Sequence, residues 1–386
     1  MSVITCVAPV NIAVIKYWGK RNEELILPLN DSISATLNVE YMRAKTTVMA
    51  SPTFKENKIW LNGKEESFEN PRLQHCMKEL KQRARKNTDV VNWNIHVCSE
   101  NNFPTAAGLA SSAAGYACFV YAIAQLYGVE GDITAIARRG SGSACRSIYG
   151  GWVQWHVGKS DDGSDSFATQ IAGVSHWPEM RILTLVVNSS RKKCSSTDGM
   201  RRSIATSSLL KYRVDHVVKD RVEGIIRAIK EKDFKAFAEI TMKDSNQFHA
   251  ICSDTYPPLS YVNEVSRRII ELIHAYNELR GTTKVAYTFD AGPNACLYLL
   301  EEDVPEVVAL IQYVFPSDTE RVEYFKGLPI NPGSLSDELK VKIDIPKQKP
   351  GSIKYIIYTD VGEGARVLND DNEHLLNDCG NPKRLN

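Results

Sequence analysis

Hydrophobic residues alternate with polar ones over much of the first hundred positions, which is typical of β-strands with one buried face. Asn62-Gly63 follows one such segment and is a turn pair that commonly joins paired strands. Apolar positions recur three and four residues apart over 71–85, and Pro71 stands where the first turn of a helix accepts proline. The pattern therefore predicts one helix at 71–85 and strands at 3–8, 34–39, 45–50, 58–61 and 92–99.

A longer apolar stretch covers residues 111–126. It is shorter than the ~20 residues that cross a bilayer, so it is predicted to be a buried helix. A short helix with Asp132 as its N-cap and Gly140 at its end follows, and then a strand at 149–157. Together these elements predict a β-rich α/β domain over residues 1–180.

Beyond Arg181 the pattern changes to long helical periods, interrupted by short apolar runs. The order β, α, β, β, α, β results if the helices after the first strand count as one layer, which predicts a ferredoxin-like domain over 181–386. Residues 369–386 are predicted to be a loosely held tail. The fold class is thus α+β, with strands at 182–188, 284–289, 295–300 and 353–359 and helices at 198–212, 214–230, 234–251, 260–279 and 304–314.

Composition narrows the classes of function. Lys and Arg total 47 against 46 Asp and Glu, so a net charge of +1 provides no global attraction for nucleic acid or a membrane surface. The nine cysteines form no CxxC pair and the N-terminus has no signal-peptide pattern, so we expect reduced thiols in a cytoplasmic protein. The histidines have no zinc-ligand spacing. Binding of anions must therefore rest on local clusters.

The strongest local signal is a loop of small residues between a predicted strand and the buried helix. Small side chains let the backbone approach a phosphate, and the free amides at a helix start donate to it. The hydroxyls of Ser111 and Ser112 can add contacts to phosphate or to Mg²⁺. The same residues also suit a tight turn for helix packing. The predicted ATP-binding loop comprises Pro104, Ala106, Ala107, Gly108, Leu109, Ala110, Ser111 and Ser112.

Two other phosphate motifs are excluded by their spacing. Gly158-Lys159-Ser160 resembles the end of a Walker A loop, but Val153 stands where the first glycine is required. Gly140-Ser141-Gly142 fails the dinucleotide pattern because Cys145 occupies the third glycine position.

Basic and hydroxyl residues gather in further segments. The run from Gly140 to Arg146 starts a short helix and places an arginine fork where it can hold a carboxylate or phosphate, or is an ordinary helix corner. Pro9 to Lys20 and Lys192 to Thr197 are either anion-binding segments or packing and capping segments. Asp290 follows an apolar strand in a turn that Gly, Pro and Asn explain without catalysis, although strand ends commonly lie at clefts.

These segments occur in one order along the chain: Tyr17-Trp18-Gly19-Lys20, the 104–115 loop, 140–146, and the Asp290 turn. Ile59 to Gly63, Asn70 to Gln74 and Ser195-Ser196-Thr197 accompany them. From about Cys6 to Leu368 the chain strongly resembles the diphosphomevalonate decarboxylases, a family within the galactokinase, homoserine kinase, mevalonate kinase and phosphomevalonate kinase (GHMP kinase) superfamily.

The resemblance implies a reaction and a homodimer. ATP phosphorylates the tertiary hydroxyl of 5-diphosphomevalonate, and phosphate and CO₂ then leave to give isopentenyl diphosphate. Mg²⁺ would be carried by the ATP phosphates, with Ser111 near it, so no protein metal cage is expected. The main alternative is a kinase of the same superfamily that stops at phosphorylation. A catalytically inactive nucleotide-binding regulator is a second alternative.

The resemblance also implies the roles of individual residues. Asp290 matches the catalytic aspartate, and Lys16 matches an active-site lysine that acts on the hydroxyl or on that aspartate. Arg146 would hold the substrate carboxylate. Ser99 and Asn101 would lie on the nucleotide side, with the phosphates at the serine loop. The implied substrate-binding residues are Tyr17, Trp18, Gly19, Lys20, Arg72, Ser141, Gly142, Ser143, Ala144, Cys145, Arg146 and Thr197.

Overall fold

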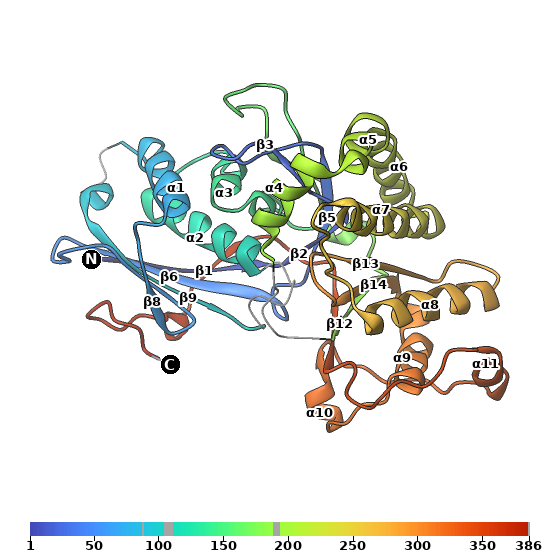
Figure 1. Cartoon of the computed structure of the whole chain (residues 1–386). Coiled ribbons are helices and arrows are strands. Elements are labelled where there is room, and N and C mark those ends of the chain that lie inside the picture. The colour runs from blue at the N-terminus through green and yellow to red at the C-terminus, as the bar shows by residue number, and fades with distance from the viewer. Residues whose placement is uncertain (87–88, 104–110, 188–193, 385–386) are drawn as a thin grey trace.

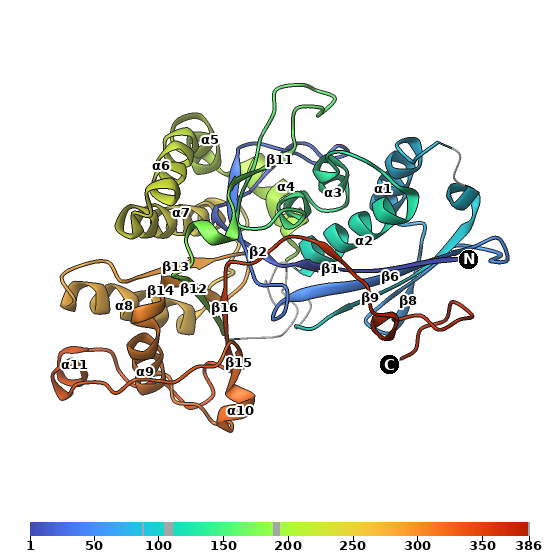
Figure 2. The same ribbon diagram turned by 180° about the vertical axis from the view of Figure 1, so that it is seen from behind.

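The computed structural model describes residues 1–86, 89–103, 111–187 and 194–384. Figure 1 shows a region with long strands and the early helices beside a second region that holds most of the later helices. The chain ends by returning to the first region, as the view from behind makes plain (Figure 2). The N-terminal and C-terminal segments therefore share one part of the molecule.

The N-terminal region is built on a six-stranded sheet with the order β17-β1-β6-β9-β7-β8. Helix α2 (Ser111–Tyr127) lies against β1 and β6, and α1 (Pro71–Gln82) packs beside it (Figure 1). The side chain of Asn70 accepts from the Arg72 amide and Pro71 occupies the first turn, so α1 begins where the sequence predicts. The strands are β1 (Ser2–Pro9), β6 (Arg43–Ser51), β7 (Lys58–Leu61), β8 (Lys64–Glu66), β9 (Asn94–Asn101) and β17 (Arg366–Leu368).

A four-stranded sheet with the order β11-β10-β5-β2 joins this region to the second one. Its edge strand β2 was not predicted. Its residues form a short apolar run within the segment from Pro9 to Lys20, which was interpreted from the sequence only as an anion-binding or packing segment. All five residues of β2 are buried. The strands are β2 (Asn11–Ile15), β5 (Ser32–Thr36), β10 (Trp152–Trp155) and β11 (Ala168–Ala172), while β3 (Lys20–Asn22) and β4 (Leu27–Pro28) form a separate small hairpin.

Two short helical elements follow α2. Helix α3 (Thr134–Gly140) has Ile133 at its N-cap without a side-chain cap bond, so the prediction of Asp132 as the N-cap was wrong by one position. The Asp132 carboxylate instead accepts from the amide and hydroxyl of Thr134. The chain then forms the 3-10 helix η2 (Gly142–Ser147), which carries Arg146.

The second region contains a five-stranded sheet with the order β13-β14-β12-β16-β15. The first strand of this region, β12, lies between β14 and β16. It is antiparallel to both, and β13 is antiparallel to β14. This arrangement confirms the predicted ferredoxin-like fold, to which β15 adds a parallel edge strand. The strands are β12 (Met180–Val186), β13 (Val285–Phe289), β14 (Ala295–Leu300), β15 (Phe325–Gly327) and β16 (Tyr355–Asp360).

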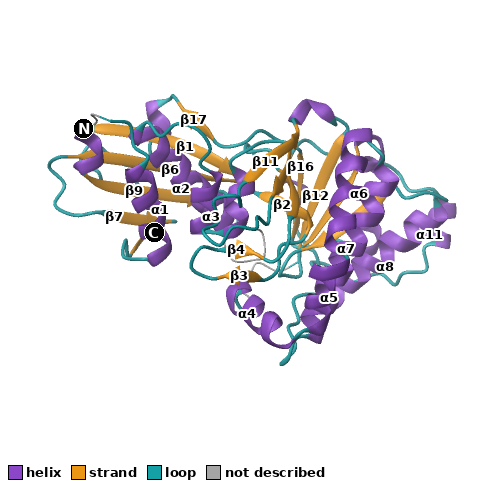
Figure 3. Cartoon of the chain, turned by 90° about the horizontal axis from the view of Figure 1, so that it is seen from above, coloured by secondary structure: helices purple, strands orange, loops and turns teal. Residues whose placement is uncertain are grey.

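Helices α6, α7 and α8 of this region lie on one side of its strands, as the view from above shows (Figure 3). No helix among the described residues has the length and apolar character that a bilayer crossing needs. The capping box of Asn263 and Ser266 begins α8. The helices are α4 (Ser196–Thr206), α5 (Ser208–His216), α6 (Val218–Glu231), α7 (Phe234–Asp254), α8 (Glu264–Leu279), α9 (Val304–Val314), α10 (Arg321–Tyr324) and α11 (Asp337–Lys342).

The predicted single helix at 198–212 is wrong, because the chain breaks at Ser207. The Ser207 hydroxyl accepts from the Leu210 amide and donates to the Asp254 carboxylate. Serine competes for backbone hydrogen bonds and favours a helix start, so α4 ends and α5 begins there.

The prediction of a loosely held tail is also wrong for residues 369–384. Leu375 and Leu376 are buried in a cluster with Met49, Trp60 and Cys98, on strands of the six-stranded sheet. The His374 ring also bonds the Thr5 hydroxyl. The tail therefore packs against the N-terminal sheet (Figure 2).

Candidate active site

A cavity of about 340 Å³ lies where segments from both regions meet. The segment after β2, η2 and the first turn of α2 come from the N-terminal half, while α4, α7 and the turn after β13 come from the second. Its charged lining residues among those described are four cations and one carboxylate, which suits an anionic ligand. They are Lys16, Lys20, Arg72, Arg146 and Asp290.

Lys16 and Asp290 form an ion pair with 2.6 Å between Nζ and Oδ1. Lys16 follows the last residue of β2, and its side chain is 4% exposed. Asp290 follows β13, where its side chain remains 27% exposed. The carboxylate is therefore held by a buried cation and still reaches the cavity, where it can accept a proton from a bound hydroxyl.

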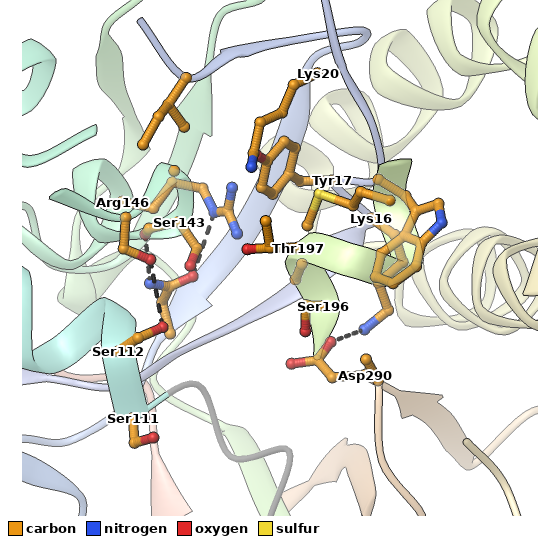
Figure 4. Close-up of a pocket in the computed structure, with 18 of the residues that line it drawn as sticks. Lys16, Tyr17, Lys20, Ser111, Ser112, Ser143, Arg146, Ser196, Thr197 and Asp290 are labelled. Carbon is orange, nitrogen blue, oxygen red and sulfur yellow. Dashed lines mark hydrogen bonds and ion pairs between the residues drawn. The ribbon is translucent and has the colours of Figure 1, made fainter. Parts of the chain in front are cut away.

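Arg146 stands on the opposite wall of the cavity (Figure 4). Its Nε donates to Asn11 Oδ1 at 3.2 Å and to Ser34 Oγ at 3.0 Å, while the buried Nη1 has no hydrogen-bond partner in the part of the chain that the structure describes. Burial lowers the pKa of the guanidinium, and the nearby Cys145 and Asp290 raise it. A buried cation with an unused donor is stabilised by an anion, so this arginine can bind a carboxylate or phosphate in two-point geometry.

Four more polar residues line the cavity. Arg72 on α1 donates to Thr197 Oγ1 on α4 at 3.3 Å, which joins the two regions across the cavity. Burial lowers the pKa of Lys20, and Glu23, at 3.6 Å, raises it. Burial raises the pKa of Tyr17 far above its usual value, and its buried hydroxyl has no hydrogen-bond partner among the described residues. Tyr17 is therefore a protonated side chain in the cavity wall.

A second pocket, of about 650 Å³, adjoins the first and shares Ser111 and Ser112 with it. Ser99 and Asn101 line this second pocket together with apolar side chains of β7, β9 and α2. Ser112 Oγ lies 3.3 Å from Ser141 Oγ, and the start of α2 lines both spaces. The amides at a helix start bind phosphate readily, and an apolar slot beside them suits a planar base.

Comparison with known proteins agrees with this geometry. A family model described as diphosphomevalonate decarboxylase-like N-terminal domain matches residues 8–168, and one described as mevalonate 5-diphosphate decarboxylase C-terminal domain matches residues 182–368. The chain belongs to the diphosphomevalonate decarboxylase family. The predicted resemblance is thereby confirmed.

Members of the family align over nearly the whole chain. The diphosphomevalonate decarboxylase of Danio rerio is 54% identical, over 100% of this chain and 97% of its own length, and that of Homo sapiens is 52% identical, over 99% and 98%. The solved mevalonate diphosphate decarboxylase from Trypanosoma brucei is 41% identical with a TM-score of 0.91, over 97% of this chain and 100% of its own. A structure described as MDDEF in complex with MVAPP, AMPPCP and magnesium is 30% identical with a TM-score of 0.72, over 96% and 100%.

Most of the residues that the family resemblance implied lie together. The larger set lines the first cavity, while Ser99 and Asn101 line the second. Six loop residues fall outside the described part of the chain: Pro104, Ala106, Ala107, Gly108, Leu109 and Ala110. The first cavity is lined by Lys16, Tyr17, Trp18, Lys20, Arg72, Ser111, Ser112, Ser141, Gly142, Ser143, Arg146, Thr197 and Asp290.

Three residues implied to bind substrate do not line either pocket. Gly19 has φ of +98°, and a Cβ there would lie 2.5 Å from Leu29 Cδ1, so it allows a close packing turn. Ala144 and Cys145 are buried, and the Cys145 thiol donates to the Gly142 carbonyl. These residues shape the wall behind the cavity.

The cavity has members that sequence reasoning missed. Asn11 reaches it from β2, and its amide donates to the Ser147 hydroxyl and the Ser143 carbonyl. The available signal in the sequence was that Asn11 is a polar residue at the start of an otherwise apolar segment. The apolar lining residues that were not predicted are Ala13, Ile26, Met200, Phe248 and Ala291. Such positions look like ordinary core in a sequence.

Proposed function

We infer that this chain catalyses the ATP-dependent decarboxylation of 5-diphosphomevalonate to isopentenyl diphosphate, with release of ADP, phosphate and CO₂. The observation that carries this function is the Lys16–Asp290 pair facing Arg146 across one cavity, next to a pocket that suits a nucleotide. Family membership supplies the reaction, and the cavity supplies groups for each chemical step.

Substrate binding follows from charge. The diphosphate and the carboxylate of the substrate carry several negative charges, and the cavity presents cations on several sides. We propose that Lys20 and Arg72 bind the diphosphate and that Arg146 holds the carboxylate. Ser143 on η2 and Thr197 on α4 add hydroxyl contacts at the same cavity.

Phosphorylation is the first proposed step. The tertiary hydroxyl lies against Asp290, which accepts its proton while the oxygen forms a bond to the γ-phosphorus of ATP and the bond to ADP breaks. Lys16 holds the carboxylate in the orientation that receives the proton. The alcohol oxygen thereby becomes part of a good leaving group.

Elimination follows. The phosphate leaves with the electron pair of the carbon–oxygen bond, and the electrons of the bond to the carboxylate carbon form the new double bond as CO₂ departs. Arg146 stabilises the charge that moves during this step, since its unused donor lies in a buried, weakly screened site. No electron-sink cofactor is required.

Magnesium fits this site only as an ion shared with the nucleotide. Among the described residues no group of three His, Cys, Asp or Glu side chains lies close enough to hold a metal. The Asp290 carboxylate and the Ser111 hydroxyl are hard oxygen donors, which suit Mg²⁺ that takes its other ligands from phosphates and water. When bound, the ion would neutralise charge on the ATP phosphates.

Three further proposals rest on family likeness. We propose a division into domains at residue 180, supported by family matches that end at residue 168 and resume at 182. We also propose a homodimer and a cytoplasmic location. Sedimentation of the purified protein and microscopy of a tagged chain would test the last two.

The decisive test of function is product analysis. Incubation with ATP, Mg²⁺ and 5-diphosphomevalonate labelled at its carboxyl carbon should release labelled CO₂ in proportion to ADP. A stable phosphorylated product without CO₂ would establish the kinase alternative instead. The regulator alternative predicts ATP binding without turnover in the wild type, and the same ATP binding in Asp290→Ala.

A further inference from the structure

We propose that Asp244 and Ser245, consecutive residues of α7, are positioning residues that set the distance between Lys16 and Asp290. The proposal rests on the proposed function, because it assigns these two residues to the proton-accepting pair of that reaction. Neither residue lines the cavity. Each holds the main chain at, or next to, one member of the pair.

The first contact fixes Lys16. The Lys16 amide donates to Asp244 Oδ1 at 2.8 Å, and the Lys16 carbonyl accepts from Arg213 Nη2 at 3.2 Å and from Asn30 Nδ2 at 3.1 Å. Lys16 lies one residue beyond the end of β2. Its main chain is therefore held by side chains, two of them from helices of the other half of the molecule, and not by the strand ladder.

Asp244 is itself held rigidly. Its side chain is 0% exposed, and it accepts from Arg213 Nη1 at 2.7 Å and Nη2 at 3.0 Å and from Arg221 Nη1 at 3.0 Å. Burial alone would raise the pKa of Asp244, but the two arginines and the Lys16 amide bring it below its usual value. The group is therefore a carboxylate with four donors on its two oxygens.

The second contact fixes the other member of the pair. The amide of Phe289, the residue before Asp290, donates to Ser245 Oγ at 3.0 Å. Ser245 is 1% exposed, and α7 packs along both β2 and β13. One turn of one helix thus determines where both charged residues leave their strands.

This arrangement matters for chemistry more than for stability. A buried ion network stabilises a fold little compared with apolar residues of the same size, because desolvation of the charges offsets their attraction. The Lys16–Asp290 contact of 2.6 Å joins residues from two different sheets, so it depends on whatever holds the two strand ends together. A displacement of ~1 Å at reacting groups can cost about 100-fold in rate.

The test compares Ser245→Ala and Asp244→Asn with Thr241→Val. Thr241 is a matched control, since it lies one turn earlier on α7, is fully buried, and its hydroxyl has no hydrogen-bond partner within the described ranges of the chain. We expect kcat to fall ~3- to 10-fold in Ser245→Ala and ~10- to 100-fold in Asp244→Asn, with KM for both substrates within about twofold of the wild type. Thr241→Val should leave kcat unchanged. Losses that fall mainly on KM, or an equal loss of kcat in the control, would overturn the proposal.

A double-mutant cycle separates positioning from a general structural defect. Each variant is combined with Lys16→Met, and single-turnover rates are measured well below the melting temperature of each protein. If Asp244 and Ser245 act through the contact between Lys16 and Asp290, which Lys16→Met removes, each adds less than about a twofold loss in that background. The same fold loss in both backgrounds refutes the proposal. Ser245→Ala keeps the buried charges paired, so it serves if Asp244→Asn does not fold.

A crystal structure of Ser245→Ala tests the positioning role independently of the proposed function. In Ser245→Ala, the separation of Lys16 Nζ from Asp290 should exceed ~3.5 Å, the limit of a hydrogen bond. An unchanged separation would overturn the positioning role even where the wild type releases CO₂. If the wild type releases no CO₂ but the separation lengthens, the proposed function fails and the positioning role stands.

Discussion

Arg146 illustrates how one residue can be costly for the fold and useful for the reaction. Its side chain is buried, and among the described residues its Nη1 donor has no partner. A buried donor without a partner lowers the stability of a fold. Replacement by Gln should lower kcat for CO₂ release about 100- to 1,000-fold, since charge stabilisation in a buried site is lost. Lysine should restore little, because it lacks the planar fork. Labelled CO₂ release measures the effect, and Arg139→Gln, outside the cavity, is the control.

His249 makes stability depend on pH. Burial, together with the charge of Lys16, lowers its pKa from 6.5 to about 4. The unfolded chain therefore binds a proton that the folded chain rejects, so the His249 contribution to the free energy of unfolding is present above pH 6.5 and lost as the pH falls toward 4. Urea unfolding across this window should show a flatter pH dependence in His249→Asn. An identical slope in the variant would contradict this prediction.

At the scale of elements, Ser207 decides where one helix becomes two. Its hydroxyl caps α5 and bonds Asp254 at the end of α7, so it links three helices. Ser207→Ala should lower the free energy of unfolding by about 1 kcal/mol, the usual effect of losing a cap. Thermal and urea unfolding measure this loss. Ser208 is the next residue and is exposed, so Ser208→Ala should change the free energy of unfolding little. This variant is the control for a general effect of replacing a serine.

At the scale of the whole molecule, the C-terminal segment that follows the last strand, β17, packs against the six-stranded sheet. Leu375 and Leu376 bury their side chains there, and burial of one leucine contributes roughly 1.5 to 3 kcal/mol. Deletion of residues 369–386 should therefore lower the melting temperature by several degrees. The shift is roughly the lost free energy of unfolding divided by the entropy of unfolding. Asp378→Asn, on the exposed part of the tail, should leave it unchanged. A deletion with the wild-type melting temperature would show that these contacts are not stabilising.

Local patterns in the sequence determined the elements. The predicted helix at 304–314 and the strands at 295–300 and 58–61 match the observed bounds, because periodicity and turn residues act over short distances. The ordered motifs also located most of the cavity-lining residues, since small residues and cations mark such segments. The break at Ser207 and strand β2 were missed where tertiary contacts override local preference.

Only the tertiary structure decided which distant groups meet. Lys16 and Asp290 are 274 positions apart, and no periodicity in either segment encodes their contact of 2.6 Å. Asp244 looked like an ordinary helix residue, although it lies buried against the Lys16 main chain. The tail was predicted to be loosely held, but two of its leucines pack against apolar side chains of a sheet whose residues are distant in the sequence. The sequence by itself thus determined the elements and the kind of chemistry, while packing alone set the geometry that the chemistry needs.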